Sequence, residues 1–552
     1  MGARCLIIGL DGADWSIVDK LVSVGRLPNI QRLIERGARA DLNSTTPPMT
    51  LPSWSSMLTG CHPGTHGIFD FVMRDSRTDN WTLQFVNANH RGVPTIHEWL
   101  SMQGKRVASI AVPTTWPPYP VNGVMVSGFD SPVSTGIDGS FCHPPEIYDE
   151  LQRRFGGLKF ADFQESVVDS DWLQDARRLL LSEIDRKQQI GTWLLEQEEW
   201  DCFMLLFGES DTASHHFWRF YDEESPRYVD ESSGLKGTIP DVYERLDTAV
   251  GVLVQQANAE VVCICSDHGF GGSGTTALYL NRFLEEKGWL QYSQIETRKR
   301  DRMLDWMRTT ALSRIPASVQ GKLFRLLPEH LKSSLETATR FGMIDFSKTL
   351  AVSDEMNYAA TIRLNIAQLS SERQHEIITE LRKDLLSWRV NGQQPVSDVW
   401  HRADLFEGDY VHRSPELILE LNLEHGYTYT LLPSVRVAKG TTWRTLEPSE
   451  WQGGKGLGMN GSHRQYGVLL LTGNNIHPIQ TDAEMADIAP TLLAALGESI
   501  PSYMEGSVLS EIFERSIHVT HVEYEPNQRE EHMISNTEHG AIRSRLEKLG
   551  YL

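Results

Sequence analysis

Short apolar runs, each followed closely by an acidic residue, recur along this chain of 552 residues. The runs 3–10, 203–207 and 261–265 are apolar almost throughout, which is typical of parallel strands buried on both faces of a sheet. Segments with helical spacing of apolar residues lie between them, such as 15–36 and 242–257. Strands that alternate with helices predict an α/β fold with a central, mostly parallel sheet between two helical layers.

The same pattern predicts the other elements and divides the chain. Further strands are expected at 38–42, 106–112, 123–128, 358–365, 416–423 and 468–471, and helices at 93–103, 144–198, 371–388 and 487–497. Residues 291–350 contain a charge run and few β-branched residues, which indicates a helical insertion or cap outside the sheet. The expected organisation is a first part of the core at 1–290, the insertion at 291–350, a second part of the core at 351–515, and a tail with an amphipathic helix at 516–552.

Composition narrows the range of functions. The net charge of −21 argues against nucleic-acid and membrane-surface binding, which both need a basic face, but it is compatible with a small phosphorylated substrate beside a bound metal. The six cysteines are scattered without a CxxC pair, as expected of reduced thiols in a cytoplasmic protein. The sequence enters the first strand at once, so no signal sequence is expected, and no apolar run is long enough to predict a membrane span.

Three of the predicted strands end next to residues that bind metals. Asp11 follows the first run, and Asp267 and His268 follow the run 261–265. Asp211 follows the run 203–207, and His215 comes four residues later, so both side chains share one face of a helical turn. Because ligands bind at the carboxyl edge of open α/β sheets, these side chains are expected to meet there.

A Gly-rich stretch at 453–461 precedes His463. The G-x-x-x-x-G-K-[ST] pattern of a phosphate-binding P-loop is absent. We therefore interpret the stretch as a flexible loop that delivers His463 to the site.

Thr50 marks the point where a Pro-rich loop enters a predicted helix. Pro52 suits the first turn of a helix, and Thr50 is expected at the N-cap position. A hydroxyl there faces backbone N–H groups and the positive end of the helix dipole, which suits a nucleophile that receives a phosphate. The alternative is a capping threonine without a catalytic role.

The candidate site is a set of seven side chains that supply oxygen and imidazole nitrogen: Asp11, Thr50, Asp211, His215, Asp267, His268 and His463. This mixture suits Zn²⁺ or Mn²⁺ better than Ca²⁺ or Mg²⁺. Seven ligands exceed the needs of one ion and indicate two neighbouring sites that share a substrate. His216 is a rival to His215, and His62 and His66 are expected to form structural hydrogen bonds, with substrate contact as the alternative.

With these motifs the sequence resembles the alkaline phosphatase superfamily and, more closely, the type I phosphodiesterase/nucleotide pyrophosphatase family. The resembling stretches are Gly9–Ala13, Thr50–Ile68, Asp211–His215, Ser266–Gly269 and Gly461–His463. The resemblance spans about residues 3–510 and is poor over 291–350. It implies a three-layer α/β/α sandwich that hydrolyses phosphoesters.

The resemblance also implies a role for each candidate residue. One divalent ion would be held by Asp11, Thr50, Asp267 and His268, and a second by Asp211, His215 and His463. Thr50 would attack phosphorus and form a phosphothreonine, which water would then hydrolyse. Zn²⁺ is the expected metal, with Mn²⁺ as the alternative.

Departures from the family pattern bear on the substrate. Nucleotide-processing members usually carry Asn where this chain has Ser53, which argues against nucleotides. The C-x-P-x-R signature of sulfatases is absent, as is the third-metal signature of phosphomonoesterases. A phosphodiester is therefore expected first, and a phosphonate ahead of a simple monoester. Phosphoryl transfer to an acceptor other than water and a non-catalytic binding role are the alternatives, and a homo-oligomer is left open.

Overall fold

The structure is a computed structural model that describes residues 2–74, 81, 83–129, 139–157, 170–231, 234–293, 343–355, 359–435, 437–452 and 459–526. Most of the expected insertion at 291–350, most of the Gly-rich stretch at 453–461 and the tail from 527 onward lie outside these residues. No helix within the described ranges combines the length and apolar character that crossing a membrane requires.

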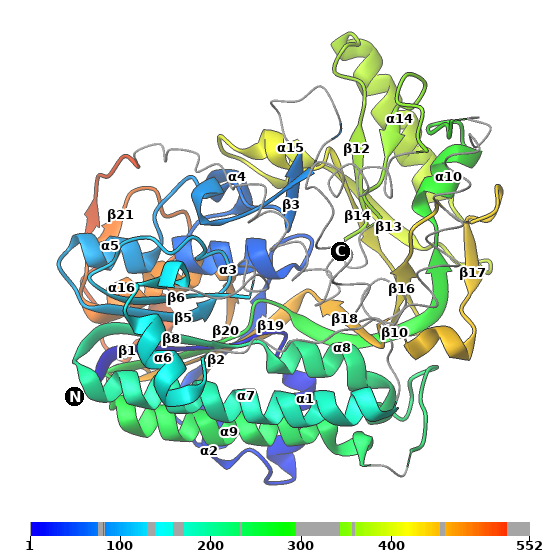
Figure 1. The fold of residues 1–552 in the computed structure, drawn as a ribbon. Helices are drawn as coiled ribbons and strands as arrows, with labels where there is room; N and C mark the ends of the chain where they lie inside the picture. Colours follow the sequence, from blue (N-terminus) through cyan, green and yellow to red (C-terminus); the bar gives the residue numbers. More distant parts are fainter. Residues whose placement is uncertain are drawn as a thin grey trace.

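A nine-stranded sheet forms the centre of the described structure (Figure 1). Its order is β20-β2-β19-β9-β1-β8-β5-β6-β7. The strands are β1 (Ala3–Leu10), β2 (Ala38–Asn43), β5 (Val107–Val112), β6 (Gly123–Ser127), β7 (Cys142–His143), β8 (Trp200–Phe207), β9 (Val261–Cys265), β19 (Tyr466–Gly473) and β20 (Ile479–Glu484). β1 lies parallel between β8 and β9, whereas β19 is antiparallel to both of its neighbours. The predicted mostly parallel sheet is confirmed.

Helices cover both faces of this sheet, because alternate residues of each strand point to opposite sides. In β1, Leu6, Ile8 and Leu10 pack into one core, and Cys5 and Ile7 pack into the other. The first core is covered by α1 (Trp15–Ser23), α2 (Pro28–Ile34), α6 (Ile147–Phe155), α7 (Ser170–Gln197), α8 (Glu209–Tyr221) and α9 (Thr238–Ala257). The second is covered by α3 (Thr50–Thr59), α5 (Ile96–Met102) and α16 (Ile488–Leu496) (Figure 1). The three-layer prediction is confirmed.

The prediction of one continuous helix over 15–36 is wrong. α1 ends at Ser23, and α2 begins at Pro28. Gly25 between them has a φ of +74°, a conformation that does not continue a helix, and Pro28 occupies the first turn of α2 where its missing N–H costs nothing.

A second, antiparallel sheet has its own hydrophobic core. It consists of β11 (Ala351–Val352), β12 (Thr361–Leu364), β14 (Leu417–Leu421) and β13 (Val396–His401), and α10 (Leu280–Glu286) and α14 (Ser371–Ser387) pack in the same core. Residues 351–421, which belong to the expected second part of the core at 351–515, therefore form a sheet of their own. The chain returns to the central sheet at β19.

A third sheet, which contains β10, lies next to the edge of the central sheet that carries the candidate site. β10 (Gly269–Leu278) pairs with β16 (Tyr427–Leu431), β17 (Trp443–Thr445) and β18 (Gly461–Arg464), and β15 (Leu423–Glu424) pairs with β16. Tyr292 and Ile344 form an isolated antiparallel bridge. The other α-helices and strands of the described residues are α4 (Pro63–His66), β3 (Val72–Arg74), β4 (Leu83–Phe85), α15 (Arg402–Leu405), β21 (Ile500–Pro501) and β22 (His521–Val522).

Candidate metal centre

The carboxyl ends of three adjacent strands bring the predicted aspartates to one edge of the sheet. Asp11 directly follows β1, and its N–H donates to the carbonyl of Phe207 at the end of β8 (2.9 Å). Asp211 lies in the first turn of α8, which begins two residues after β8 ends. Asp267 comes two residues after the end of β9. Because the three strands are parallel neighbours, their ends converge.

A glycine allows the first and second of these ends to approach closely. Gly12 has a φ of +63°, and its N–H donates to Asp267 Oδ1 at 3.1 Å. A Cβ at this position would lie 3.2 Å from both Cα and Cβ of Asp211. Ser210 adds a bond to the same loop, since its hydroxyl donates to the Asp11 carbonyl at 2.6 Å. The loop after β1 is therefore fixed against both neighbouring carboxylates.

His463 reaches the site from a distant part of the chain. β18 pairs antiparallel with β10 and sets His463 opposite Phe270. Asp211 Oδ1 lies 3.0 Å from His215 Nε2 and 3.5 Å from His463 Nε2. Asp211, His215 and His463 therefore form one buried group whose ligand atoms all lie within 4.8 Å of one another.

In His215, His463 and His268, the Nδ1 atom faces a backbone carbonyl, which fixes the tautomer that each ring has when it is neutral. Nδ1 donates to the carbonyl of Gly461 in His215 (2.9 Å), of Pro48 in His463 (2.9 Å) and of Gly269 in His268 (3.0 Å). Because a carbonyl oxygen only accepts, Nδ1 carries the proton of each neutral ring, and Nε2 presents a lone pair. All three Nε2 atoms face the cluster. A backbone acceptor on the far nitrogen is the usual arrangement of metal-binding histidines.

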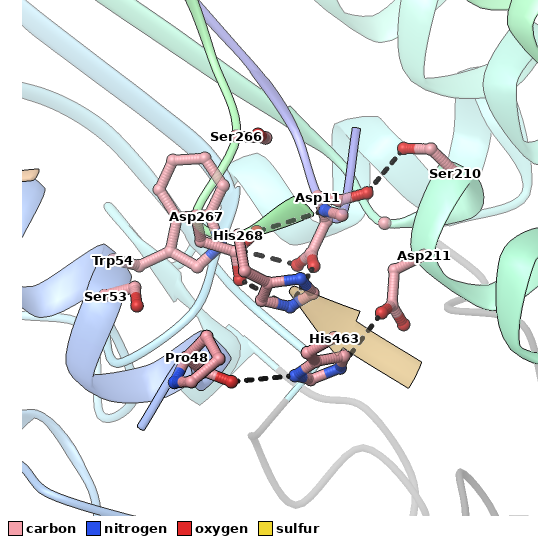
Figure 2. A network of polar contacts seen from close by, with 12 residues as sticks. Asp11, Pro48, Ser53, Trp54, Ser210, Asp211, Ser266, Asp267, His268 and His463 are labelled. Atoms are coloured by element: carbon pink, nitrogen blue, oxygen red, sulfur yellow. Dashed lines mark hydrogen bonds and ion pairs between the residues drawn. The ribbon is translucent and has the colours of Figure 1, made fainter. Parts of the chain in front are cut away.

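A second buried group lies beside the first, and Asp211 belongs to both. Asp11, Asp211 and His268 also place ligand atoms within 4.8 Å of one another. His268 Nε2 lies 3.3 Å from Asp267 Oδ2 and 3.8 Å from Asp11 Oδ1 (Figure 2). Neither Asp11 Oδ1 nor Asp267 Oδ2 accepts a hydrogen bond from the described residues. Buried acceptors that converge in this way fit a cation between them.

Burial raises the pKa values of the carboxyl groups in this cluster, which a cation would reverse, and lowers that of His463, which a cation would reinforce. Burial, together with the charges of Asp267 and Asp211, raises the pKa of Asp11 well above its usual value. Burial also raises the pKa of Asp267 to about 7 and lowers that of His463 well below its usual value. Negative charge is costly here without a compensating ion, and the donor set of carboxylate oxygens and neutral imidazoles suits a divalent metal.

Thr50 is the first residue of α3 and has no exposed surface. Its predicted N-cap position is wrong by one residue, because Met49 is the N-cap and the Thr50 hydroxyl caps nothing. One turn later, Trp54 donates from Nε1 to Asp11 Oδ2 (3.4 Å). Pro48, just before the helix, accepts from His463 (Figure 2). The start of α3 is therefore joined to both buried groups.

The buried hydroxyl groups of α3 differ in whether they have a hydrogen-bond partner among the described residues. Ser53, Ser55, Ser56 and Thr59 are all buried, and each forms a hydrogen bond within the described structure. Thr50 Oγ1 is buried and has no such partner among the described residues. The hydroxyl that the sequence singles out is thus the one in this helix that is left available for another interaction.

The family model for type I phosphodiesterase / nucleotide pyrophosphatase matches residues 5–442. The chain belongs to this family. The family is metal-dependent, and the two buried groups of this member can hold metal ions. It is a family of hydrolases that act on small phosphorylated substrates.

Solved structures share the fold at low sequence identity. Phosphonoacetate hydrolase from Sinorhizobium meliloti 1021, in complex with phosphonoformate, is 16% identical, with a TM-score of 0.53; the match covers 90% of this chain and 95% of that one. Human ectonucleotide pyrophosphatase/phosphodiesterase 5 is 12% identical, with a TM-score of 0.50, and the match covers 93% of this chain and 99% of that one. A search of curated proteins found no match. The neighbours show that this family member has the alkaline phosphatase-like architecture.

The other histidines near the motifs lie outside the two groups. His66 is buried, accepts the Ile68 N–H at 3.2 Å and lies 3.0 Å from Ser56 Oγ, so the expected structural role is confirmed. His62 lies 3.6 Å from a carboxylate oxygen of Glu484. His216 packs its ring edge against Trp172 and belongs to neither group within the described residues.

Sequence reasoning missed the buried ion pair that holds α8 in place. Lys187 of α7 and Glu209 in the first turn of α8 are both about 95% buried, with Nζ and Oε1 2.9 Å apart. A charged residue can be buried only with a partner, so the pair fixes the start of the helix that carries Asp211 and His215. The sequence signal that could have predicted this ion pair is a lysine, Lys187, on the apolar face of α7.

Proposed function

We propose that this chain hydrolyses a phosphoester at two divalent ions, with Thr50 as the nucleophile. In this proposal Asp11, Thr50, Asp267 and His268 hold one ion, and Asp211, His215 and His463 hold the other. The observation that carries the proposal is the convergence of three Nε2 lone pairs and three carboxylates beside the start of α3. His215 Nε2 and His463 Nε2 lie 3.2 Å apart and both approach Asp211 Oδ1, so a cation at this point would be bound by all three atoms.

The reaction proceeds in two displacements on phosphorus. When bound, the ions would activate the Thr50 hydroxyl and a water molecule and balance the charge of the phosphate. The Thr50 oxygen forms a bond to phosphorus while the bond to the leaving oxygen breaks, which gives a phosphothreonine. Water then attacks from the vacated side, and the bond to Thr50 breaks. The N-terminal end of α3 adds favourable dipole charge on the phosphate throughout.

A phosphodiester is the proposed substrate class. The family to which the chain belongs is named for phosphodiester and pyrophosphate cleavage. The Ser53 hydroxyl, which stands where nucleotide-processing members carry Asn, is already hydrogen-bonded to Ser44 and Thr45. It is therefore not available to hold a phosphate oxygen, which argues against nucleotides. Zn²⁺ is the proposed metal, with Mn²⁺ as the alternative.

The deciding experiment compares wild type, Thr50→Ala and Thr59→Ala with bis-p-nitrophenyl phosphate in the presence of Zn²⁺ or Mn²⁺. Thr59 lies in the same helix, is equally buried and donates to the Ser55 carbonyl, so it is a matched control. We expect Thr50→Ala to lower kcat by about 1,000-fold or more, and Thr59→Ala by less than about 3-fold. Equal turnover by wild type and Thr50→Ala would end the nucleophile proposal.

Two further measurements define the reaction class. Mass spectrometry of acid-quenched enzyme is expected to find phosphate on Thr50 during turnover. A panel of a phosphomonoester, a phosphodiester, a pyrophosphate and a phosphonate ranks the substrate classes, and product analysis with alcohol acceptors separates hydrolysis from phosphoryl transfer.

The proposed location is the cytoplasm. All six cysteines are unpaired and buried, which is usual in a reducing compartment. Cell fractionation tests this location. A homo-oligomer also stays a prediction, which sedimentation analysis of the purified protein would test.

A further inference from the structure

Three buried hydroxyls connect the first turn of α3 to the end of β9. Ser53 Oγ lies 2.8 Å from Ser44 Oγ and 2.9 Å from Thr45 Oγ1, and Ser44 Oγ donates to the Asp267 carbonyl at 2.6 Å. A carbonyl only accepts, so the single Ser44 proton is used there, and Ser44 must accept the proton of Ser53. Thr45 Oγ1 donates to the carbonyl of Pro47 at 3.1 Å, so its single proton is used there, as that of Ser44 is used at Asp267.

The direction of these bonds is therefore set by the last acceptor. Protons point from Ser53 to Ser44, and from Ser44 to the carbonyl of Asp267. Hydrogen bonds aligned in this way polarise one another and strengthen the chain. We call Ser53, Ser44 and the Asp267 carbonyl the hydroxyl chain.

Both ends of the hydroxyl chain belong to the candidate site. The carbonyl of Asp267 is part of the peptide that joins it to His268, so one hydrogen bond fixes the backbone between two proposed ligands. At the other end, Ser53 lies three residues after Thr50 in the first turn of the same helix. The loop before the helix is fixed to the other group as well, since the Pro48 carbonyl accepts from His463.

We propose that Ser53 is a positioning residue that sets the separation between the Thr50 hydroxyl and the Asp267–His268 ligands. It acts through Ser44 and not on the substrate, because it has no exposed surface and its proton is used within the chain. The inference rests on the proposed function for the identity of the nucleophile and ligands. It adds a physical reason why Ser occupies this position.

The test compares Ser53→Ala and Ser44→Ala with Ser55→Ala. Ser55 is the matched control, since it is a fully buried serine of α3 whose hydroxyl donates to Thr114 Oγ1 (3.2 Å), away from the ligands. Each variant is assayed for kcat and KM, and its Zn²⁺ affinity is measured separately by chelator-buffered titration of the metal-free protein. Thermal unfolding verifies that each variant is folded.

Removal of either link is expected to lower kcat and Zn²⁺ affinity by about 10- to 100-fold, as for other residues that orient metal ligands, and to change KM by less than about 3-fold. Ser55→Ala is expected to stay within about 3-fold of wild type in both. The double variant Ser44→Ala/Ser53→Ala is expected to be no worse than the poorer single variant, because the chain is broken once.

The proposal is overturned if Ser53→Ala keeps wild-type kcat and Zn²⁺ affinity, if Ser55→Ala loses as much, or if the losses of the single variants multiply in the double variant. If Ser53→Ala does not fold, Ser44→Ala alone decides between the same outcomes. The Zn²⁺ titration does not depend on turnover, so it separates this proposal from the nucleophile proposal, which fails only through an active Thr50→Ala variant.

Discussion

The Nε2 atoms of His215 and His463 lie 3.2 Å apart, while each ring donates its Nδ1–H to a backbone carbonyl. Asp211 Oδ1 lies 3.0 Å from the first of these nitrogens and 3.5 Å from the second, so three potential metal-binding atoms meet at one point. A divalent ion between these atoms would be bound by all three of them. The stability of the protein is therefore expected to depend on a metal that binds the folded chain.

Removal of metal is expected to destabilise the wild-type protein, and Zn²⁺ is expected to restore it. At a free Zn²⁺ concentration 100 times Kd, one site adds about 2.7 kcal/mol to the free energy of unfolding. Elemental analysis of wild type is expected to find about two equivalents per chain, and of His463→Ala about one. Calorimetry with and without chelator checks the stabilisation.

His412→Ala is the matched control for this measurement. His412 is exposed and has the same Nδ1 bond to a backbone carbonyl, that of Asp409 at 3.0 Å, but it lies in neither buried group. It should bind as much metal as wild type. Full metal content in His463→Ala, or a chelator-insensitive melting curve of wild type, would contradict the assignment of the metal centre.

The ion pair between Lys187 and Glu209 provides a second prediction. Lys187→Met leaves a buried carboxylate without its partner, and we expect the free energy of unfolding to fall by about 3–5 kcal/mol. Replacing both residues, Lys187→Met with Glu209→Leu, is expected to recover most of this loss, because a buried pair offsets little more than its own desolvation. Urea unfolding of metal-free protein measures both changes.

An exposed ion pair on the same helix calibrates this effect. Arg178 pairs with Asp175 on α7, and both side chains are at least 70% exposed. Arg178→Ala should change the free energy of unfolding by less than about 0.5 kcal/mol. A similar loss for Arg178→Ala and Lys187→Met would show that burial of the Lys187 pair does not matter.

The parts of the fold that the sequence predicts well are those buried on both faces. The apolar runs at 3–10 and 261–265 coincide with β1 (Ala3–Leu10) and β9 (Val261–Cys265). The ends of such strands can be predicted from the sequence, because the first acidic residue after the apolar run lies just beyond the end of the strand. Asp11 and Asp267 were found by that rule, and their meeting follows from parallel pairing alone.

The sequence does not separate the second sheet from the core, because the strands of this sheet are short. β13 (Val396–His401) has only two buried residues, and its register shifts between Val396 and Asp398, so its pattern does not distinguish one sheet from another. The hydroxyl chain is invisible in the sequence for a different reason. Ser44 and Asp267 are 223 residues apart, and small polar residues have no periodicity that would connect them.

A fully buried histidine outside the metal centre makes the stability depend on pH. His97 in α5 has no exposed surface, and burial lowers its pKa to about 4. The unfolded chain, with a histidine pKa near 6.5, then binds more protons than the folded chain below that pH. The stability from this residue is complete above about pH 6.5 and is lost as the pH falls toward 4, by about 3 kcal/mol in total.

His97→Leu removes this titration and fills the site with an apolar side chain. Neither ring nitrogen has a hydrogen-bond partner among the described residues, so at pH 7.5 the variant is expected to lie within about 1.5 kcal/mol of wild type. Between pH 7.5 and 5, metal-free wild type should lose about 2 kcal/mol more than His97→Leu by urea unfolding. The acidic ligands titrate in both proteins, so their contribution cancels in the difference. His375→Leu, at an exposed position of α14, should follow the wild-type pH dependence, and parallel curves for wild type and His97→Leu would show that His97 does not set it.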